Sequence, residues 1–131
     1  MASRRDSGYL QRRRELEALA RRLFIAKGGR PRRSTPRYMV VGACPWLESW
    51  YTDPDCIRIP LSGFDPDTVS FTYGDLFPTF SPRVSDDREY RRKVYTLPEM
   101  LVLIDRYGYP QIWNPNGEHG PERYIEAQVW E

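Results

Sequence analysis

Histidine and cysteine are scarce in this chain. Its 131 residues include one histidine, His119, and two cysteines, Cys44 and Cys56. The cysteines are not in CxxC spacing and have no histidine pair nearby, whereas a structural zinc site needs about four clustered nitrogen or sulfur ligands. The sequence therefore predicts no metal site. Without an export signal, two reduced thiols are expected rather than a disulfide, and His119 is expected to be a solvated loop residue.

Long apolar runs and the motifs of common enzymes are also missing. No apolar stretch approaches the length that crosses a membrane, and no apolar segment follows the basic N-terminus as it would in a secretory signal. We therefore expect a cytoplasmic protein with no membrane partner. The chain contains no P-loop, GxGxxG, GxSxG or HExxH motif, which removes the commonest nucleotide-binding and hydrolase interpretations. No cofactor is expected.

Acidic residues are scarce in the first part of the chain, and basic residues are outnumbered in the rest. Residues 1–37 contain twelve Lys or Arg and three acidic residues, a net charge of +9, whereas residues 38–131 contain eight basic and fifteen acidic residues, a net charge of −7. The net charge of +2 hides this division. Such an asymmetry indicates a basic segment that binds an acidic partner, either within the chain or outside it.

Residues 9–27 have the pattern of a basic amphipathic helix. Leu16, Leu19 and Leu23 recur at helical spacing and form one apolar stripe, and Gly28 follows the pattern as a helix terminator. The next residues, GGRPRRSTPR, are basic and broken by two prolines, as in a linker. We expect the stripe to pack on the rest of the chain or on a second copy, so a homodimer through this helix is one of the predictions.

The remaining chain predicts a small α+β domain. Thr96 and Glu99 form a capping box before an apolar periodic run, and Gly108 ends it, which predicts a core helix over 96–108. Short β-prone runs predict a mostly antiparallel sheet of about five strands, at 38–43, 56–61, 68–73, 90–96 and 123–130. We therefore divide the chain into a basic helix with its Arg/Pro linker, 1–36, and a compact α+β domain, 37–131.

The basic segment is the first candidate functional site. Arginine forks suit phosphate oxygens, and several neutralised phosphates give affinity without sequence specificity. No helix-turn-helix, zinc-finger or RRM signature is present. The leading hypothesis is a binding module that contacts nucleic acid or an acidic protein; equally open is pairing with the acidic body of the same chain. The candidate contact residues are Arg12, Arg13, Arg14, Arg21, Arg22, Arg30, Arg32 and Arg33.

An aromatic-rich loop at 74–83 is the second candidate. It places large rings between prolines beside a few polar groups, and an apolar cleft with converging polar groups is the usual form of a ligand site. The alternative is that the rings fill the open end of the sheet, and the two roles are compatible. The predicted pocket consists of Arg37, Phe77, Thr79, Phe80 and Arg83.

A third pattern runs through three predicted strands. Arg37 begins the first, Ser70 and Thr72 lie two residues apart on a later one, and Glu126-Ala-Gln128 lies on the last. This order loosely resembles the Arg, Ser-x-Ser and Glu-x-Glu order of ADP-ribosyltransferases, with Gln128 standing where that family places its catalytic Glu. The resemblance implies a small enzyme acting on a nucleotide-like ligand, NAD in that family. Its catalytic candidates are Ser70, Asp75 and Glu126. Ser70, Thr72 and Glu126 are expected together on solvent-facing strand positions.

Overall fold

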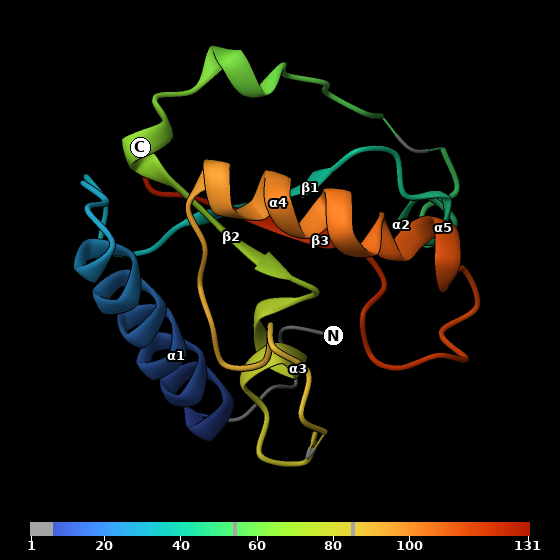
Figure 1. Ribbon diagram of the computed structural model, residues 1–131, viewed down its shortest axis with the longest axis horizontal. Coiled ribbons are helices and arrows are strands. Elements are labelled where there is room, and N and C mark those ends of the chain that lie inside the picture. Colours follow the sequence, from blue (N-terminus) through green and yellow to red (C-terminus); the bar gives the residue numbers. More distant parts are fainter. Residues whose placement is uncertain (1–6, 54, 85) are drawn as a thin grey trace.

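The computed structural model describes residues 7–53, 55–84 and 86–131 and combines helices with one sheet (Figure 1). This confirms the expected mixture of helix and strand. The helices and strands in chain order are α1 (Ser7–Ala26), β1 (Arg37–Val41), α2 (Pro45–Glu48), η2 (Leu61–Gly63), η3 (Pro66–Thr68), β2 (Val69–Tyr73), α3 (Leu76–Phe80), α4 (Leu97–Tyr107), α5 (Pro110–Trp113) and β3 (Ile125–Val129).

The sheet of the described residues has three strands, not about five. Its order is β1-β3-β2, and the last strand of the chain pairs antiparallel with both others. Met39, Ala127 and Phe71 lie side by side across the sheet. Since side chains alternate between faces along a strand, this row faces one side, and Glu126 and Gln128 face the other.

Two of the five predicted strands, 56–61 and 90–96, do not form, and the reasons differ. Residues 56–60 have strand-like composition but no strand pairing, and Ile57 stays 84% exposed because no core side chain meets it. Residues 90–96 form turns, with a single bridge in which Phe71 and Tyr95 exchange two backbone hydrogen bonds. A positive φ of 57° at Arg92 kinks this segment, which prevents a regular ladder.

The first core cluster lies between the sheet and α4. Val69, Phe71, Tyr73, Ile125, Ala127 and Val129 supply it from the strands, and Met100 and Leu103 supply it from the helix. The helix predicted over 96–108 is present: the Glu99 carboxylate accepts a hydrogen bond from the Thr96 backbone N–H at 3.0 Å, and Gly108 ends the helix with a φ of 77°. Leu101 of the same helix faces away from the core and is 51% exposed.

The second core cluster lies between the other face of the sheet and α1. Ala20 and Phe24 of the helix are fully buried against Leu76, Val94 and Trp130, and Leu16 and Leu23 pack beside them. Figure 1 shows α4 in front of the strands and α1 along one side of the sheet. The apolar stripe of the basic helix therefore packs on the body of its own chain.

The linker after α1 is held to the sheet by its backbone. Arg32 and Arg33 both donate their backbone N–H to the carbonyl of Trp130, at 2.8 and 2.9 Å, and Arg30 donates to the carbonyl of Asp67. These bonds place the arginine side chains of the linker at the end of β3. The domain boundary at residue 36 stays a prediction. In the described part of the chain, no helix has the length and apolar character required to cross a membrane.

Candidate functional site

Gln128 is the centre of a buried polar network on the α1 side of the sheet. Its side-chain oxygen accepts a hydrogen bond from the Ser70 hydroxyl at 2.8 Å, and its side-chain nitrogen donates to the Thr72 hydroxyl at 3.0 Å and to Glu126 at 3.1 Å. Trp130 donates its indole N–H to Ser70 at 2.9 Å. The expectation that Ser70, Thr72 and Glu126 face solvent was wrong: Ser70 and Thr72 have no exposed surface and Glu126 is 5% exposed, because helices cover this face.

Glu126 and Asp75 meet at the edge of this network. A Glu126 carboxylate oxygen also accepts the backbone N–H of Leu76 at 3.3 Å, and Asp75 caps α3 by accepting the backbone N–H of Phe77 at 3.0 Å. Tyr124 donates its hydroxyl to Asp75 at 3.1 Å. The structure therefore brings the three catalytic candidates together through Gln128 and α3.

The environment of Glu126 favours its protonated form. Burial, with the nearby negative charge of Asp75, raises the pKa of this carboxyl to about 8, against the hydrogen bonds from Gln128 and Leu76 that lower it. A carboxyl group with a pKa near neutrality can give or take a proton at working pH. Chemistry of that kind would require a substrate to reach a group that is 5% exposed.

Arg37 lies apart from this network. It is exposed at the start of β1 and pairs with Val129, whereas Tyr38 and Val40 pair with Gln128 and Glu126. Because successive side chains point to opposite faces, Arg37 is on the α4 side of the sheet and Glu126 is on the α1 side. The structure does not assemble the arginine with the polar residues.

The other predicted pocket residues are dispersed around α3. Thr79 is buried, with its hydroxyl 3.5 Å from the carbonyl of Tyr73, and Phe80 packs on the second core cluster. Phe77 stacks on Tyr9 of α1 with ring centroids 5.9 Å apart, and Arg83 is exposed. Two cavities of the described chain border β1, and neither is lined by any of these four residues or by Arg37.

Some arginines of the basic segment have partners within the chain. Arg13 lies 3.7 Å from Glu17 and over the Tyr38 ring, and Arg21 donates to the backbone carbonyls of Arg33 and Pro31. The Glu17 carboxylate also accepts the Tyr38 hydroxyl at 2.6 Å. A looser contact of 3.8 Å joins Arg32 to Asp65, with both side chains largely exposed.

Other arginines remain without partners. Arg12, Arg14 and Arg22 are exposed and make no side-chain hydrogen bond or ion pair with any residue of the described chain, and the same is true of the side chains of Arg30 and Arg33. At 100° per residue, Arg22 falls on the side of α1 opposite the buried Ala20 and Phe24, and Arg12 and Arg14 lie about 100° to either side of that buried pair. The acidic body therefore neutralises only part of the basic segment. We call Arg12, Arg14 and Arg22 the arginine face.

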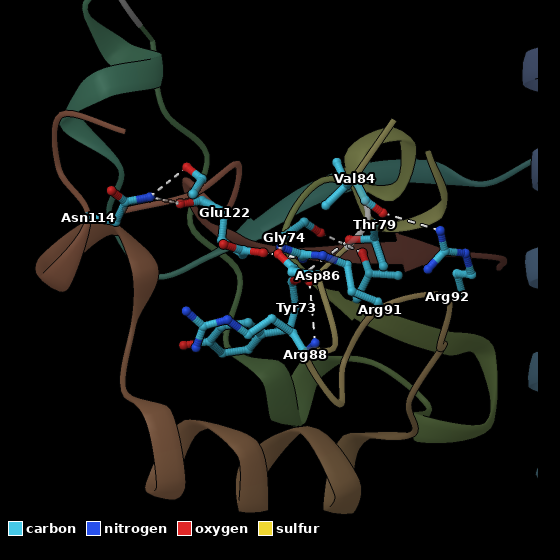
Figure 2. Close-up of polar contacts among 12 residues, drawn as sticks. Tyr73, Gly74, Thr79, Val84, Asp86, Arg88, Arg91, Arg92, Asn114 and Glu122 are labelled. Atoms are coloured by element: carbon cyan, nitrogen blue, oxygen red, sulfur yellow. Dashed lines mark hydrogen bonds and ion pairs between the residues drawn. The ribbon is translucent and has the colours of Figure 1, made fainter. Parts of the chain in front are cut away.

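Two further features were not predicted from the sequence. The first is a buried ion pair between Arg91 and Glu122, shown in Figure 2, where Arg91 also bonds to Asp86 at 2.8 Å. Asn114 donates to the backbone carbonyl of Glu122 at 2.6 Å and fixes that residue. A run of charged residues at 86–93 gave no sign of which one is buried, because charged residues almost never are.

The second is a cavity of about 650 Å³, which lies between β1 and residues 53 and 55–59. No sequence pattern predicts this cavity, because residues 56–61 have the pattern of a paired strand. Both cysteines line it. In the described part of the chain, no three His, Cys, Asp or Glu side chains gather closely enough to hold a metal ion.

Comparisons with known proteins add no family to this geometry. No protein-family model matches the chain, and neither the curated proteins nor the solved structures gave a match.

Proposed function

We propose that this chain is a binding module whose arginine face contacts the phosphate backbone of a nucleic acid. The observation that supports this proposal is the lack of any partner, in the described chain, for Arg12, Arg14 and Arg22. The body from residue 38 onwards has seven more acidic than basic residues, yet these three arginines lie outside its reach.

The position of the arginine face suits a long charged ligand. Arg14 and Arg22 are eight residues apart, which corresponds to about 12 Å along a helix axis. Phe24 and Ala20 hold α1 on the body, so the arginines project from a fixed element. Guanidinium groups bind phosphate oxygens through paired N–H donors, and each neutralised phosphate releases counterions. Binding of this kind is strong at low salt and independent of sequence.

The test compares two charge-matched variants. In the first, Arg14→Gln and Arg22→Gln are combined, which removes two charges from the arginine face. In the control, Arg88→Gln and Arg106→Gln remove two exposed arginines outside α1 and the linker. Fluorescence anisotropy with a labelled DNA duplex at low salt should show roughly tenfold weaker binding for the first variant and a much smaller change for the control. Truncation of α1 is a poorer test, since it removes Ala20 and Phe24 from the core.

Two results would overturn the proposal. One is the absence of salt-sensitive duplex binding by the wild-type chain. The other is binding to polyglutamate but not to the duplex, which would assign the arginine face to an acidic protein partner. A homodimer through α1 also stays a prediction; with Leu16 and Leu23 packed on the body, it would use the arginine face, where like charges repel.

A second proposal is an enzyme acting on a nucleotide-like ligand. One observation favours it: Glu126, with its raised pKa, lies in a hydrogen-bonded group with Ser70 and Gln128. Because these residues are covered, a ligand could reach them only if α1 or α3 moved. A ligand that binds only the folded chain raises its melting temperature. Millimolar NAD should therefore raise the melting temperature of the wild type but not of Glu126→Gln, and an unchanged wild-type melting temperature would reject the enzyme.

A further inference from the structure

The outer edge of β1 is open. This strand is at one end of the order β1-β3-β2, so its backbone pairs with β3 on one side only. On the other side, the described chain supplies a side chain rather than a strand: Gln111 donates to the carbonyl of Val41 at 2.8 Å and approaches that of Ala43 at 3.3 Å. An edge strand with free N–H and C=O groups is a template for another extended segment.

Residues 55–60, which we call the strap, lie across the large cavity from this edge. The cavity is lined on one side by Tyr38, Met39 and Val40 and on the other by residues 55–59 of the strap, with a volume of about 650 Å³ between them. Figure 1 shows the chain leaving α2 and passing back across the molecule to the start of β2. Residues 55–59 of the strap make no backbone hydrogen bond within the described chain, although Ile57 and Ile59 are β-branched residues that favour strands.

Apolar side chains at the groove are exposed to an unusual degree. Tyr51 is 65% exposed, Ile57 84% and Ile59 45%. Large apolar groups gathered on one surface of a folded chain mark an interaction site more often than chance exposure does. These three, with Val40 and Leu47 inside the cavity, offer pockets for the apolar side chains of an occupant.

The charges of the groove are mostly negative. Glu48, Asp53 and Asp55 line it, against a single basic residue, Arg58. An occupant with basic side chains would complement these carboxylates. The basic linker of the same chain cannot occupy the groove, because its backbone is hydrogen-bonded to Trp130 and Asp67. A second copy of the chain is also a poor occupant, because it would bring the carboxylates of the two grooves together, where like charges repel.

We propose that the groove between β1 and the strap binds an extended peptide segment of another protein, with alternating basic and apolar side chains. The segment adds a strand to the free edge of β1, which is the mode of recognition called β-augmentation. Its backbone pairs with the five residues of β1, its apolar side chains contact Tyr51 and Ile57, and its basic side chains meet Asp53 and Asp55. This site is independent of the arginine face.

The test uses a defined probe. The probe is a short fluorescent peptide of alternating lysine and valine with blocked ends. Two controls have the same length: alternating glutamate and valine, which reverses the charge, and a lysine–valine peptide with proline at alternate positions, which cannot form the ladder. The wild-type chain should bind the first peptide saturably and the controls much more weakly. Backbone amide shifts in NMR should change most at 38–41 and 55–59.

Variants of the groove make the test specific. Combining Asp53→Asn and Asp55→Asn removes two exposed carboxylates and should weaken binding roughly three- to tenfold at low salt. Ile57→Thr, at a side chain that is 84% exposed, should weaken binding without affecting folding. The proposal is overturned if the three peptides bind equally, if the shifts concentrate on α1, if no saturable binding occurs at millimolar peptide, or if light scattering shows a dimer paired through β1.

Discussion

At the residue scale, Glu126 couples the stability of the fold to pH. Its pKa is raised to about 8 in the folded chain, so the folded state keeps a proton that the unfolded state loses above its usual pKa near 4.5. Where the folded state binds more protons, stability falls as pH rises. The free energy of unfolding should therefore decrease through the window from about pH 4.5 to pH 8, by about 3 to 5 kcal/mol from this group.

The variant Glu126→Gln tests this coupling. A glutamine is neutral at all pH values and can still accept the hydrogen bonds from Leu76 and Gln128. Urea unfolding should find it more stable than the wild type at about pH 9 and close to it at about pH 5. Glu118→Gln, at an exposed loop carboxylate, is the control for the loss of one acidic side chain. Equal losses of stability in Glu126→Gln and the wild type between the two pH values would contradict the account.

A second residue-scale prediction concerns the buried pair of Arg91 and Glu122. Both side chains are less than 5% exposed, so removing one leaves the other charged and unpaired inside the molecule. Arg91→Met should lower the free energy of unfolding by about 3 to 5 kcal/mol. Adding Glu122→Gln to that variant should recover part of the loss, as a double-mutant cycle measures. The exposed Arg88→Met serves as control; an equal effect at both arginines would show that the pair does not hold the 86–93 segment.

At the element scale, α1 is part of the core. Phe24 is 1% exposed and packs on Val94 and Trp130, whereas its neighbour Ile25 is 46% exposed. Phe24→Ala should cost about 3 to 5 kcal/mol, and Ile25→Ala should stay within about 0.5 kcal/mol of the wild type. Thermal unfolding of both variants measures the difference. If the two changes cost the same, α1 does not contribute to the stability of the body.

Elements with local signals could be predicted from the sequence. The helix over 97–107 has a capping box and a terminal glycine, β1 is a short apolar run, and β3 has apolar alternation, so all three were found within a few residues of their bounds. Residues 56–61 have the same β-prone composition but no partner strand. Pairing depends on distant residues, which is why local pattern could not decide it.

The candidate site was predictable only in part, for a related reason. Alternation along the strands correctly grouped Ser70, Thr72 and Glu126 on one face, and also implied that Arg37 lies on the other once the register is known. Polar residues on one face normally indicate solvent. Here α1 and α3 cover that face, and the interlocking hydrogen bonds of Gln128 make its burial possible. No pattern in a single sequence shows that helices will pack over a polar face of a sheet.

At the scale of the whole molecule, the charge division of the sequence becomes a spatial division. The apolar stripe of α1 and two of its arginines, Arg13 and Arg21, are used to dock the helix. The arginine face is exposed on α1, and the acidic residues of the body include those of the groove at β1. One molecule thus presents a basic helix and an acidic groove as separate surfaces, to which we assign different partners as proposals.

The most direct test of this account is the salt dependence of duplex binding by the arginine face. The logarithm of the association constant should fall linearly with the logarithm of salt concentration, and each phosphate contact contributes about 0.9 to the slope. Removing all three arginines by Arg12→Gln, Arg14→Gln and Arg22→Gln should make the slope shallower by about 2 to 3. A slope that is unchanged in this variant would contradict the claim that the unpaired arginines of α1 bind phosphate.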